Sequence, residues 1–450
     1  MIGWGWVVST GTWIQDGGVL GAAIGFLIGG VMIFFVGLTY AELTSAMPQC
    51  GGEHVFSHRA MGPIGSFICT WAIVLGYASV VCFEACALPT IVTYIFPDFL
   101  QGYLYTVAGF KVYASWLAVA IGMSILMTYI NIRGIKAAAK LQTILTVIIG
   151  AAGILLVIVS AITGSVSTLE PQAFIPGDTT TTFKAVLAVA VTTPFYFIGF
   201  DVIPQAAEEI NVPLKKIGKI LILSVVCAVL FYALVIIAVG LVLTDSEIIA
   251  AESGTGLVTA DAMAKALSSA TMAKVIIIGG MCGIVTSWNS FLMGGSRALY
   301  SMAESYMVPR FFAKLHPKYK TPINALYLIG FLSIIAPLAG RKMLVWIVDA
   351  GNFGCCLAYC MVALYAIPNS GSTLVWQEWC MAGGWGLLGV IFAVACKRKY
   401  QERFGTLALI ISDEDAAALQ SSDEEISVAL DRAIDDAINK ILAERRLTTA

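Results

Sequence analysis

Charged residues are scarce in this sequence. Asp, Glu, Lys and Arg make up 12% of its 450 residues, which is about half of their share in an ordinary soluble domain. Many of these charges gather in the last fifty residues, so the rest of the chain is poorer still. The net charge is −2 and no basic stripe is present, so nothing indicates a nucleic-acid partner. This scarcity of charge excludes an ordinary soluble protein.

The chain also lacks the residue clusters that catalysis and metal binding require. His54, His58 and His316 fall in polar links expected on the cytoplasmic side and are spread too widely to nominate a site. The 11 Cys are scattered through apolar stretches without CxxC spacing, and we interpret them as small packing residues. No Walker A loop occurs, so ATP is excluded as the energy source. We therefore expect no enzyme activity, no metal and no cofactor.

Long apolar runs make up most of what is present. Hydrophobic residues account for 59% of the chain, and the mean hydropathy is +0.87. A helix of about 20 apolar residues crosses the hydrocarbon core of a bilayer. The sequence therefore predicts an all-α polytopic membrane protein, without a cleavable signal peptide. Hydropathy predicts about eleven spans, at residues 1–14, 18–41, 64–96, 112–131, 138–163, 184–205, 218–243, 271–302, 322–340, 343–367 and 379–396.

The distribution of Lys and Arg predicts the orientation. The links after the second, fourth, sixth and eighth spans are basic, whereas the others are acidic or neutral apart from Lys111 and the Arg341-Lys342 pair. The excess of positive charge marks the cytoplasmic side, so the amino terminus is expected in the cytoplasm of a plasma-membrane protein. Eleven spans would then leave the basic stretch 397–403 outside. A missing span, a partial crossing between Pro368 and Trp379, or an external tail would resolve this conflict, and we favour the missing span.

An acidic tail follows the last predicted span, at residues 405–450. Ser422 and Glu425 have the spacing of a capping box, and apolar residues then recur at about helical spacing. We interpret this tail as an amphipathic cytoplasmic helix that packs on the transporter domain, residues 1–396. A regulatory role is the alternative.

Two glycine-containing stretches interrupt apolar segments at similar places in the two halves of the chain. They are Gly3-Trp4-Gly5 and the run from Phe197 to Asp201, which contains Gly199. A helix broken in mid-membrane leaves backbone polar groups unpaired, which is tolerated only around a cavity or a bound solute. The two breaks predict a secondary transporter for a small polar solute. Close helix packing around glycine is the alternative for each.

Several motifs resemble those of amino acid permeases in the amino acid–polyamine–organocation superfamily. They extend over nearly all of residues 1–367 and lie at 40–43 with 51–56, at 198–201 with 207–213, and at 296–303 with 309–322. The resemblance implies the fold of the leucine transporter, with two inverted five-helix repeats at about 1–163 and 184–367. It also implies that the first and sixth helices are broken at a central binding site.

The chain departs from the family pattern in four places. The cytoplasmic half of the first helix is expected to be absent, since Met1 directly precedes the glycine pair. The eleventh of the family's usual twelve helices is expected to be deleted, which agrees with the charge distribution. Trp4 replaces a small residue between the two glycines. Some relatives carry a Lys in the fifth helix near Ile149, where it stands in for a sodium ion. No Lys lies there in this chain, which puts that coupling mechanism in doubt.

A zwitterionic amino acid needs a partner for each of its charges. Val7 and Val8 are expected to offer backbone N–H groups to the carboxylate where a half-helix begins after Gly5. Ile198 and Gly199 are expected to offer carbonyl oxygens to the ammonium. The resemblance gives Phe195 the role of an aromatic lid, and Trp4 is expected to narrow the pocket or stack on the solute. Further lining candidates, for which a plain core position is the alternative, are Tyr77, Trp288, Asn289 and Phe291.

Carboxylates inside a membrane are costly and usually functional. Glu84 lies well inside the third predicted span, and we expect it to bind a cationic group or to carry a proton. The alternative is a Glu hydrogen-bonded near an outer water funnel. Asp201 is a second candidate for a proton or cation, although a structural role at helix-end N–H groups is favoured. Glu42, Glu208 and Arg297 are expected to form an inner gate, with solvated interfacial charges as the alternative.

These observations predict an amino acid permease that works by alternating access and is driven by a proton gradient or by exchange. A polyamine or other organic-amine antiporter is one alternative, which Glu84 would favour. A non-transporting sensor or scaffold is another, which the missing elements and the acidic tail would favour. The expected partners are a small amino acid or amine and the lipid bilayer.

Overall fold

The computed structural model describes residues 1–107, 110–209, 214–340, 351 and 353–359. The chain divides into two compact units, Met1–Thr406 and Leu407–Ala450, and all described residues belong to the first. The acidic tail, the span at 379–396, the basic stretch at 397–403 and most of the span at 343–367 lie outside the described residues. The predictions made for them stay predictions.

The first apolar segment is helical only after its glycine pair. Residues before Gly5 are non-helical, and α1 (Gly5–Val8) continues into α2 (Thr10–Gly17) through Ser9. The N–H of Ser9 donates to Gly5 and that of Trp13 donates to Ser9, so the two pieces form nearly one rod. Gly18 then adopts φ +74°, which glycine reaches without strain, and α3 (Val19–Ala46) follows.

The next helix begins eleven residues earlier than hydropathy predicts. Helix α4 (Glu53–Ile95) contains a single non-helical residue, Gly62, at φ 72° and ψ −171°. Pro63 follows it, where a fixed φ suits the start of a helix. The predicted polar link therefore contains a short helix of its own. His54 lies on this helix and is fully buried.

A small antiparallel hairpin interrupts the helical fold between α4 and α5. It joins β1 (Tyr103–Val107) to β2 (Phe110–Tyr113), and both strands are rich in the aromatic and β-branched residues that favour strands. Its buried Val112 packs against Trp116 of α5 and Cys86 of α4. Hydropathy did not predict this hairpin, because its alternating exposure gives no long apolar run.

The remaining elements are helical. After α5 (Ala114–Ile132) they are α6 (Ile135–Thr163), α7 (Val166–Leu169), η2 (Glu170–Gln172), α8 (Thr179–Phe197), α9 (Val202–Gln205), η3 (Ala207–Glu209), α10 (Leu214–Val242), α11 (Asp245–Ser253), α12 (Val258–Ala266), α13 (Ala270–Glu304), η4 (Arg310–Ala313), α14 (Ile323–Ile335) and η5 (Ala336–Ala339); η1 (Pro97–Phe99) precedes the hairpin. Within the described part of the chain, 7 helices are long and apolar enough to cross a membrane. The all-α polytopic class is confirmed.

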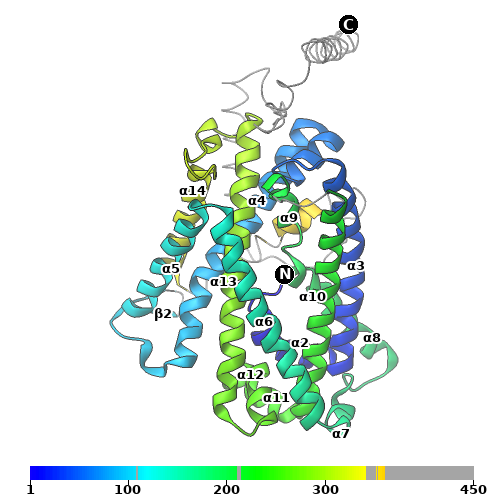
Figure 1. Ribbon diagram of the computed structural model, residues 1–450. Coiled ribbons are helices and arrows are strands. Elements are labelled where there is room, and N and C mark those ends of the chain that lie inside the picture. Colours follow the sequence, from blue (N-terminus) through cyan, green and yellow to red (C-terminus); the bar gives the residue numbers. More distant parts are fainter. Residues whose placement is uncertain (108–109, 210–213, 341–350, 352, 360–450) are drawn as a thin grey trace, which may run out of the picture. The chain divides into compact units, whose positions relative to one another are not determined.

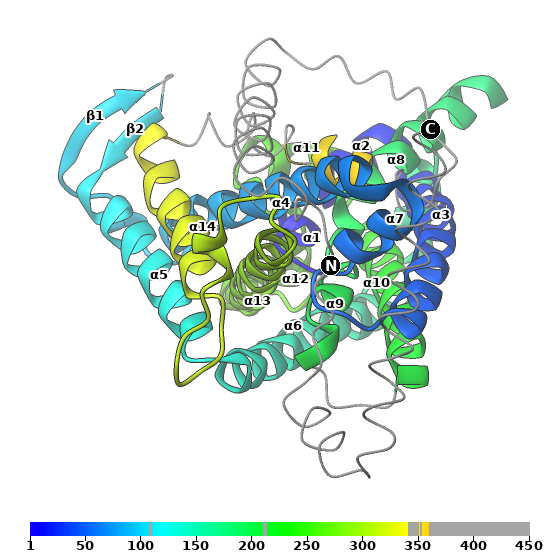
Figure 2. The same cartoon turned by 90° about the horizontal axis from the view of Figure 1, so that it is seen from above.

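The helices of the two predicted repeats pack against their counterparts. Helix α3 packs along α10, α4 along α13, and α5 along α14, and these pairs are the second, third and fourth helices of the two halves. Figure 2 shows α13 next to the short helix α1, and both Figures 1 and 2 show α5 beside α14 at the edge of the bundle. Pairing of like with like agrees with an inverted repeat.

Glycines on α3 let its neighbours approach closely. A methyl group on Gly30 would lie 2.5 Å from Cγ2 of Val229 on α10, and one on Gly29 would overlap Thr193 on α8. Small residues serve this purpose in membranes because close van der Waals packing, rather than the hydrophobic effect, holds helices together there.

We expect Gly30→Ala to destabilise the bundle. Its methyl group meets the stiff Val229 side chain, and overpacking of this kind costs about 1–3 kcal/mol. The matched control is Gly122→Ala on α5, where nothing lies within 4 Å of the added methyl. Thermal unfolding in detergent should show a lower midpoint for Gly30→Ala alone. Equal midpoints for the two variants would contradict the close approach of α3 and α10.

Candidate functional site

An interrupted helix meets the non-helical start of the first segment near the centre of the described unit. Helix α8 ends at Phe197 and α9 begins at Val202, with Gly199 between them at φ +124°. A Cβ on Gly199 would lie 2.8 Å from the backbone nitrogen of Met1, so this break lies against the non-helical stretch before α1. The interruption predicted around Gly199 is confirmed, and the helical part of the first segment begins at Gly5, the second glycine of the predicted pair.

Asp201 stabilises the break in α8. Its Oδ1 accepts the N–H of Gly199 at 2.7 Å, and its Oδ2 accepts the hydroxyl of Tyr77 at 2.5 Å. All of Asp201 is buried. An unpaired backbone N–H in this setting would cost free energy, so the carboxylate supplies an acceptor that the broken helix lacks. The geometry agrees with the structural role favoured from the sequence.

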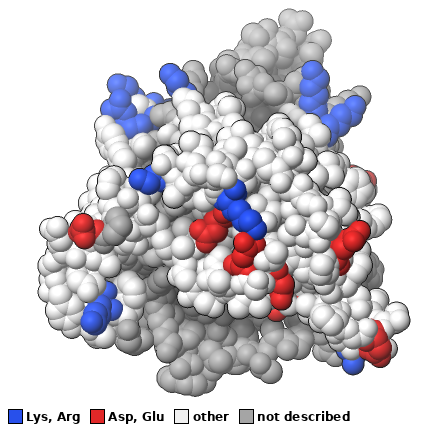
Figure 3. Space-filling view, turned by 90° about the horizontal axis from the view of Figure 1, so that it is seen from below, with Lys and Arg blue, Asp and Glu red and all other residues white. Residues whose placement is uncertain are grey.

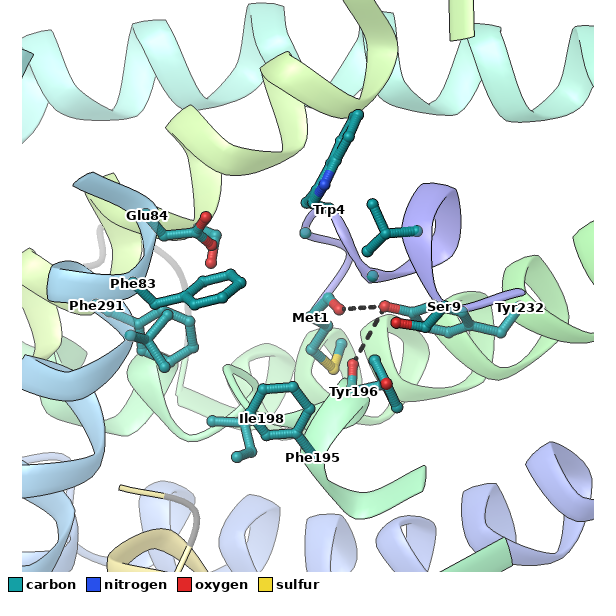
Figure 4. A pocket seen from close by; sticks show the side chains of 15 residues that line it. Met1, Trp4, Ser9, Phe83, Glu84, Phe195, Tyr196, Ile198, Tyr232 and Phe291 are labelled. Carbon is teal, nitrogen blue, oxygen red and sulfur yellow. Dashed lines mark hydrogen bonds between the residues drawn. The ribbon is translucent and has the colours of Figure 1, made fainter. Parts of the chain in front are cut away.

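A cavity of about 120 Å³ lies between the break at Gly199 and the start of α1 (Figure 4). Its walls come from the start of α1, the middle of α4, the end of α8, one position on α10 and two positions on α13. Most of the lining is aromatic or aliphatic. The lining residues are Met1, Gly3, Trp4, Gly5, Val8, Ser9, Val80, Phe83, Glu84, Phe195, Tyr196, Ile198, Tyr232, Ser287 and Phe291.

Most of the predicted binding residues line this cavity, but five do not. Those present are Gly3, Trp4, Gly5, Val8, Phe195, Ile198, Phe291 and Glu84. Val7 is buried and its N–H donates to Trp4 O at 2.9 Å, so it is not free to bind a carboxylate. The N–H groups of Gly5 and Trp6 lie in the first turn of the helix instead, and the helix has no earlier carbonyl to accept them. The other residues off the cavity are Tyr77, Gly199, Trp288 and Asn289.

Asn289 takes part in a buried amide cluster instead. Its Oδ1 accepts from Asn131 of α5 at 2.9 Å, and its Nδ2 donates to Gln142 of α6 at 3.0 Å. It also borders a second, larger cavity of about 580 Å³ between α6, α9, α10 and α13, which Gly199 lines as well. The predicted contact of Asn289 with a solute in the central cavity is therefore not supported.

Glu84 points its carboxyl group into the central cavity (Figure 4). The residue is 3% exposed, and its Oε2 has no hydrogen-bond partner among the described residues. A buried polar atom without a partner is costly. Such an atom facing a cavity is suited to a ligand or a proton.

Sequence reasoning missed two tyrosines of the cavity. Tyr232 of α10 donates its hydroxyl to the carbonyl of Met1 at 3.0 Å, and its hydroxyl also lies 3.4 Å from the carbonyl of Tyr196. Tyr196 packs over Gly5, since a Cβ there would lie 2.7 Å from the tyrosine ring. The aromatic run before the break, Phe195 to Phe197, was the available signal.

Glycines on α13 were missed as well. Gly280 leaves room for the ring of Trp4, and Gly283 leaves room for the backbone of Gly3. They belong to a cluster with Gly279, and small residues four apart are typical of close helix approach in membranes. This spacing could have been read from the sequence.

The proposed inner-gate residues occupy different environments. Arg297 is 1% exposed and donates to the Ser296 hydroxyl at 3.1 Å, whereas Glu42 is exposed. Glu208 is exposed too and accepts the N–H of Cys50 at 2.9 Å. Their role as a gate stays a prediction.

Helices α11 and α12 pack against α1 and α2. Thr12 of α2 donates to Glu252 at 2.9 Å, and Thr259 of α12 donates to the carbonyl of Val7 at 3.3 Å. Lys265 and Glu247 form a salt bridge of 2.6 Å, and the hydrogen bond from Lys265 lowers the pKa of Glu247. Figure 3 shows acidic and basic side chains next to one another near the centre of the face seen from below.

Comparison with known proteins identifies the family. The family model described as "Amino acid permease" matches residues 1–370. The chain belongs to the amino acid permease family. It is therefore a multi-pass membrane protein that transports amino acids or related organic solutes, and it is not an enzyme.

The names of three similar proteins refer to different substrates. The chain is 29% identical to the "Branched-chain amino acid permease BcaP" of Bacillus subtilis, with 74% of this chain and 70% of that protein covered. It is 29% identical to the "Methylthioribose transporter" of the same organism (82% and 77%). It is 24% identical to the "Lysine-specific permease LysP" of Escherichia coli (81% and 74%).

We expect Asp201→Ala to destabilise this permease more than Asp201→Asn. Alanine leaves the Gly199 N–H and the Tyr77 hydroxyl unpaired, at about 1–3 kcal/mol each, whereas an Asn carbonyl still accepts from Gly199. Thermal unfolding in detergent, with Asp98→Asn on the exposed η1 as a control, checks this order. Equal midpoints for Asp201→Ala and Asp201→Asn would refute the proposed stabilisation of the break.

Proposed function

We propose that this permease carries amino acids with apolar side chains by secondary active transport. The observation that supports this most directly is the cavity between the break at Gly199 and the non-helical start of the first segment, with exposed main-chain polarity at both ends and aromatic walls. Main-chain groups suit the common part of an amino acid, and aromatic walls suit an apolar side chain. One of the compared relatives is named a branched-chain amino acid permease, in line with this choice.

The two charges of the amino acid would bind at the start of the first helix and at the break after α8. The start of the rod formed by α1 and α2 presents the N–H groups of Gly5 and Trp6, and the positive end of the helix dipole favours a carboxylate there. The carbonyl of Ile198, in the break after α8, is the proposed acceptor for the ammonium. Phe195 would act as a lid, and Trp4 would bound the side-chain end of the cavity.

Transport would proceed by alternating access in the plasma membrane, with the amino terminus on the cytoplasmic side. The α11–α12 pair holds α2 through Thr12 and Val7, and we assign it to the outer gate. Glu42, Glu208 and Arg297 are the candidates for the inner gate. The helices on the two sides of the break at Gly199 can then tilt separately around the solute.

The energy would come from a proton gradient or from exchange against a second solute. Glu84 is the proposed proton carrier, because its carboxyl group is buried and faces the cavity with one oxygen unpartnered among the described residues. Asp201 is less suited to this role, since both of its oxygens already accept hydrogen bonds.

A second candidate function is the antiport of an organic amine. The same Glu84 supports it, because a carboxylate at the wall of an otherwise apolar cavity would pair with a second positive charge on a solute. One of the compared relatives is named a lysine-specific permease, in line with transport of a solute that carries a second positive charge. A non-transporting sensor or scaffold is the third reading, and its main support, the acidic tail, lies outside the described residues.

Uptake by proteoliposomes separates these three functions. We expect the wild type to accumulate labelled leucine or valine more than lysine or putrescine. Gly5→Ala places a methyl group against Tyr196 and should lower uptake at least tenfold, whereas the lipid-facing Gly122→Ala should retain it. Preferred uptake of putrescine would support the amine antiporter instead. No uptake of any solute by a folded wild type would contradict transport altogether.

The role of Glu84 is tested by its pH dependence. If its proton is coupled to transport, wild-type uptake should increase as the external pH falls, and Glu84→Gln should abolish this response. The control is Glu170→Gln, which removes an exposed carboxylate away from the cavity. An unchanged pH response and unchanged selectivity in Glu84→Gln would exclude the proposed role.

A further inference from the structure

A large apolar groove lies on the flank of the protein, away from the central cavity. It runs between α5 and α14, which lie side by side at the edge of the bundle in Figure 2, and η4 borders one end. Its volume is about 660 Å³. The lining residues are Ile125, Thr128, Tyr129, Ile132, Phe311, Phe312, Asn324, Tyr327, Leu328, Gly330, Phe331 and Ile334.

The groove follows from a close crossing of its two helices. Gly330 of α14 leaves just enough space for the side chain of Thr128 on α5, since a Cβ on the glycine would overlap the threonine. Large side chains stand on both sides of this crossing and stay open to the surroundings. Tyr129 is 53% exposed, Tyr327 54% and Phe331 58%. In a membrane these walls face lipid.

Hydrogen bonds hold the end of the groove in place. Asn324 of α14 donates to the carbonyl of Phe311 at 2.6 Å, which ties η4 to the groove wall. Thr321 donates to the carbonyl of Ile132 at 3.0 Å, which ties the start of α14 to the end of α5. The groove is therefore a built surface and not a gap between mobile loops.

An apolar groove alone does not select one lipid over another. An acyl chain gains little by moving from other lipid tails into such a groove, because both surroundings are equally apolar. Any selection must come from the headgroup, at the polar end of the groove.

Two cations meet at this polar end. Arg133, directly after α5, donates to the hydroxyl of the groove residue Tyr129 at 3.0 Å. Its guanidinium lies 5.6 Å from the ring centre of Tyr319, and the ammonium of Lys318 lies 5.6 Å from the same ring. The two charges therefore lie near the same ring, beside a residue that lines the groove.

These cations lack acidic neighbours. The sequence from 305 to 322 contains four Lys or Arg and no Asp or Glu. Arg310 pairs with Glu304 at 3.3 Å, but Arg133 and Lys318 form no ion pair within the described part of the chain, and both are exposed. A negatively charged group from outside the protein would complement them.

We propose that the groove between α5 and α14 binds one acyl chain of an anionic glycerophospholipid, whose phosphate lies between Arg133 and Lys318. The positive-inside prediction places this end at the cytoplasmic leaflet, where anionic lipids attract basic residues near the surface. The bound lipid bridges α5, α14 and the link that contains η4, and it stabilises this pair of helices.

Native mass spectrometry of the full chain tests the proposal. The protein is purified, then exposed to an equal mixture of phosphatidylglycerol and phosphatidylcholine with identical chains. We expect the wild type to retain about tenfold more phosphatidylglycerol. Equal retention of the two lipids overturns the proposal, and so does a dimer that keeps the groove free of lipid, since a second copy would then be its occupant.

Variants locate the site. Arg133→Gln with Lys318→Gln should abolish the preference, whereas Lys111→Gln with Lys184→Gln removes two exposed charges elsewhere and should keep it. The charge-conserving pair Arg133→Lys with Lys318→Arg serves if the first variant does not fold, and it should also keep the preference. Ile125→Trp fills the groove and should reduce retention of both lipids. An equal loss of preference in the Lys111 and Lys184 control would overturn the assignment to this groove.

Discussion

The structure depends on one constraint, which is that main-chain polar groups need partners in a medium without water. The break in α8 satisfies it locally. Asp201 accepts the N–H of Gly199 and the hydroxyl of Tyr77, so the interrupted backbone is stable without closing into a helix. The carbonyl of Ile198 and the first N–H groups of α1 are the proposed partners of a solute. The same feature is thus a risk to folding and the basis of the proposed binding site.

Glycines on the neighbouring helix α13 make room for the non-helical stretch before Gly5. Gly280 and Gly283 on α13 admit Trp4 and the backbone of Gly3, so the non-helical start of the chain lies directly on a neighbouring helix. The resemblance to the family implies a small residue at the position of Trp4, and Gly280 leaves room for the larger ring found here. A bulky residue and its complementary glycines together bound the cavity.

Several features could be predicted from residues alone and others could not. Hydropathy and charge predicted the class and most of the spans, because membrane length and the absence of water act on every residue of a segment. The short helix before Gly62 and the hairpin after α4 were missed, since neither forms a long apolar run. Asn289 was assigned to the binding cavity. Its side-chain amide instead forms hydrogen bonds with Asn131 and Gln142, which lie more than 140 residues away in sequence.

The sequence by itself determined the membrane class, the family and the helix break at Gly199, because each of these follows from local composition and short motifs. Only the tertiary structure decided which side chains share a cavity. Glu84 and Asp201 look alike in sequence as carboxylates inside the membrane, yet Asp201 has both oxygens occupied and Glu84 presents an unpartnered oxygen to the cavity within the described chain. That difference depends on neighbours from distant helices, which no local pattern specifies.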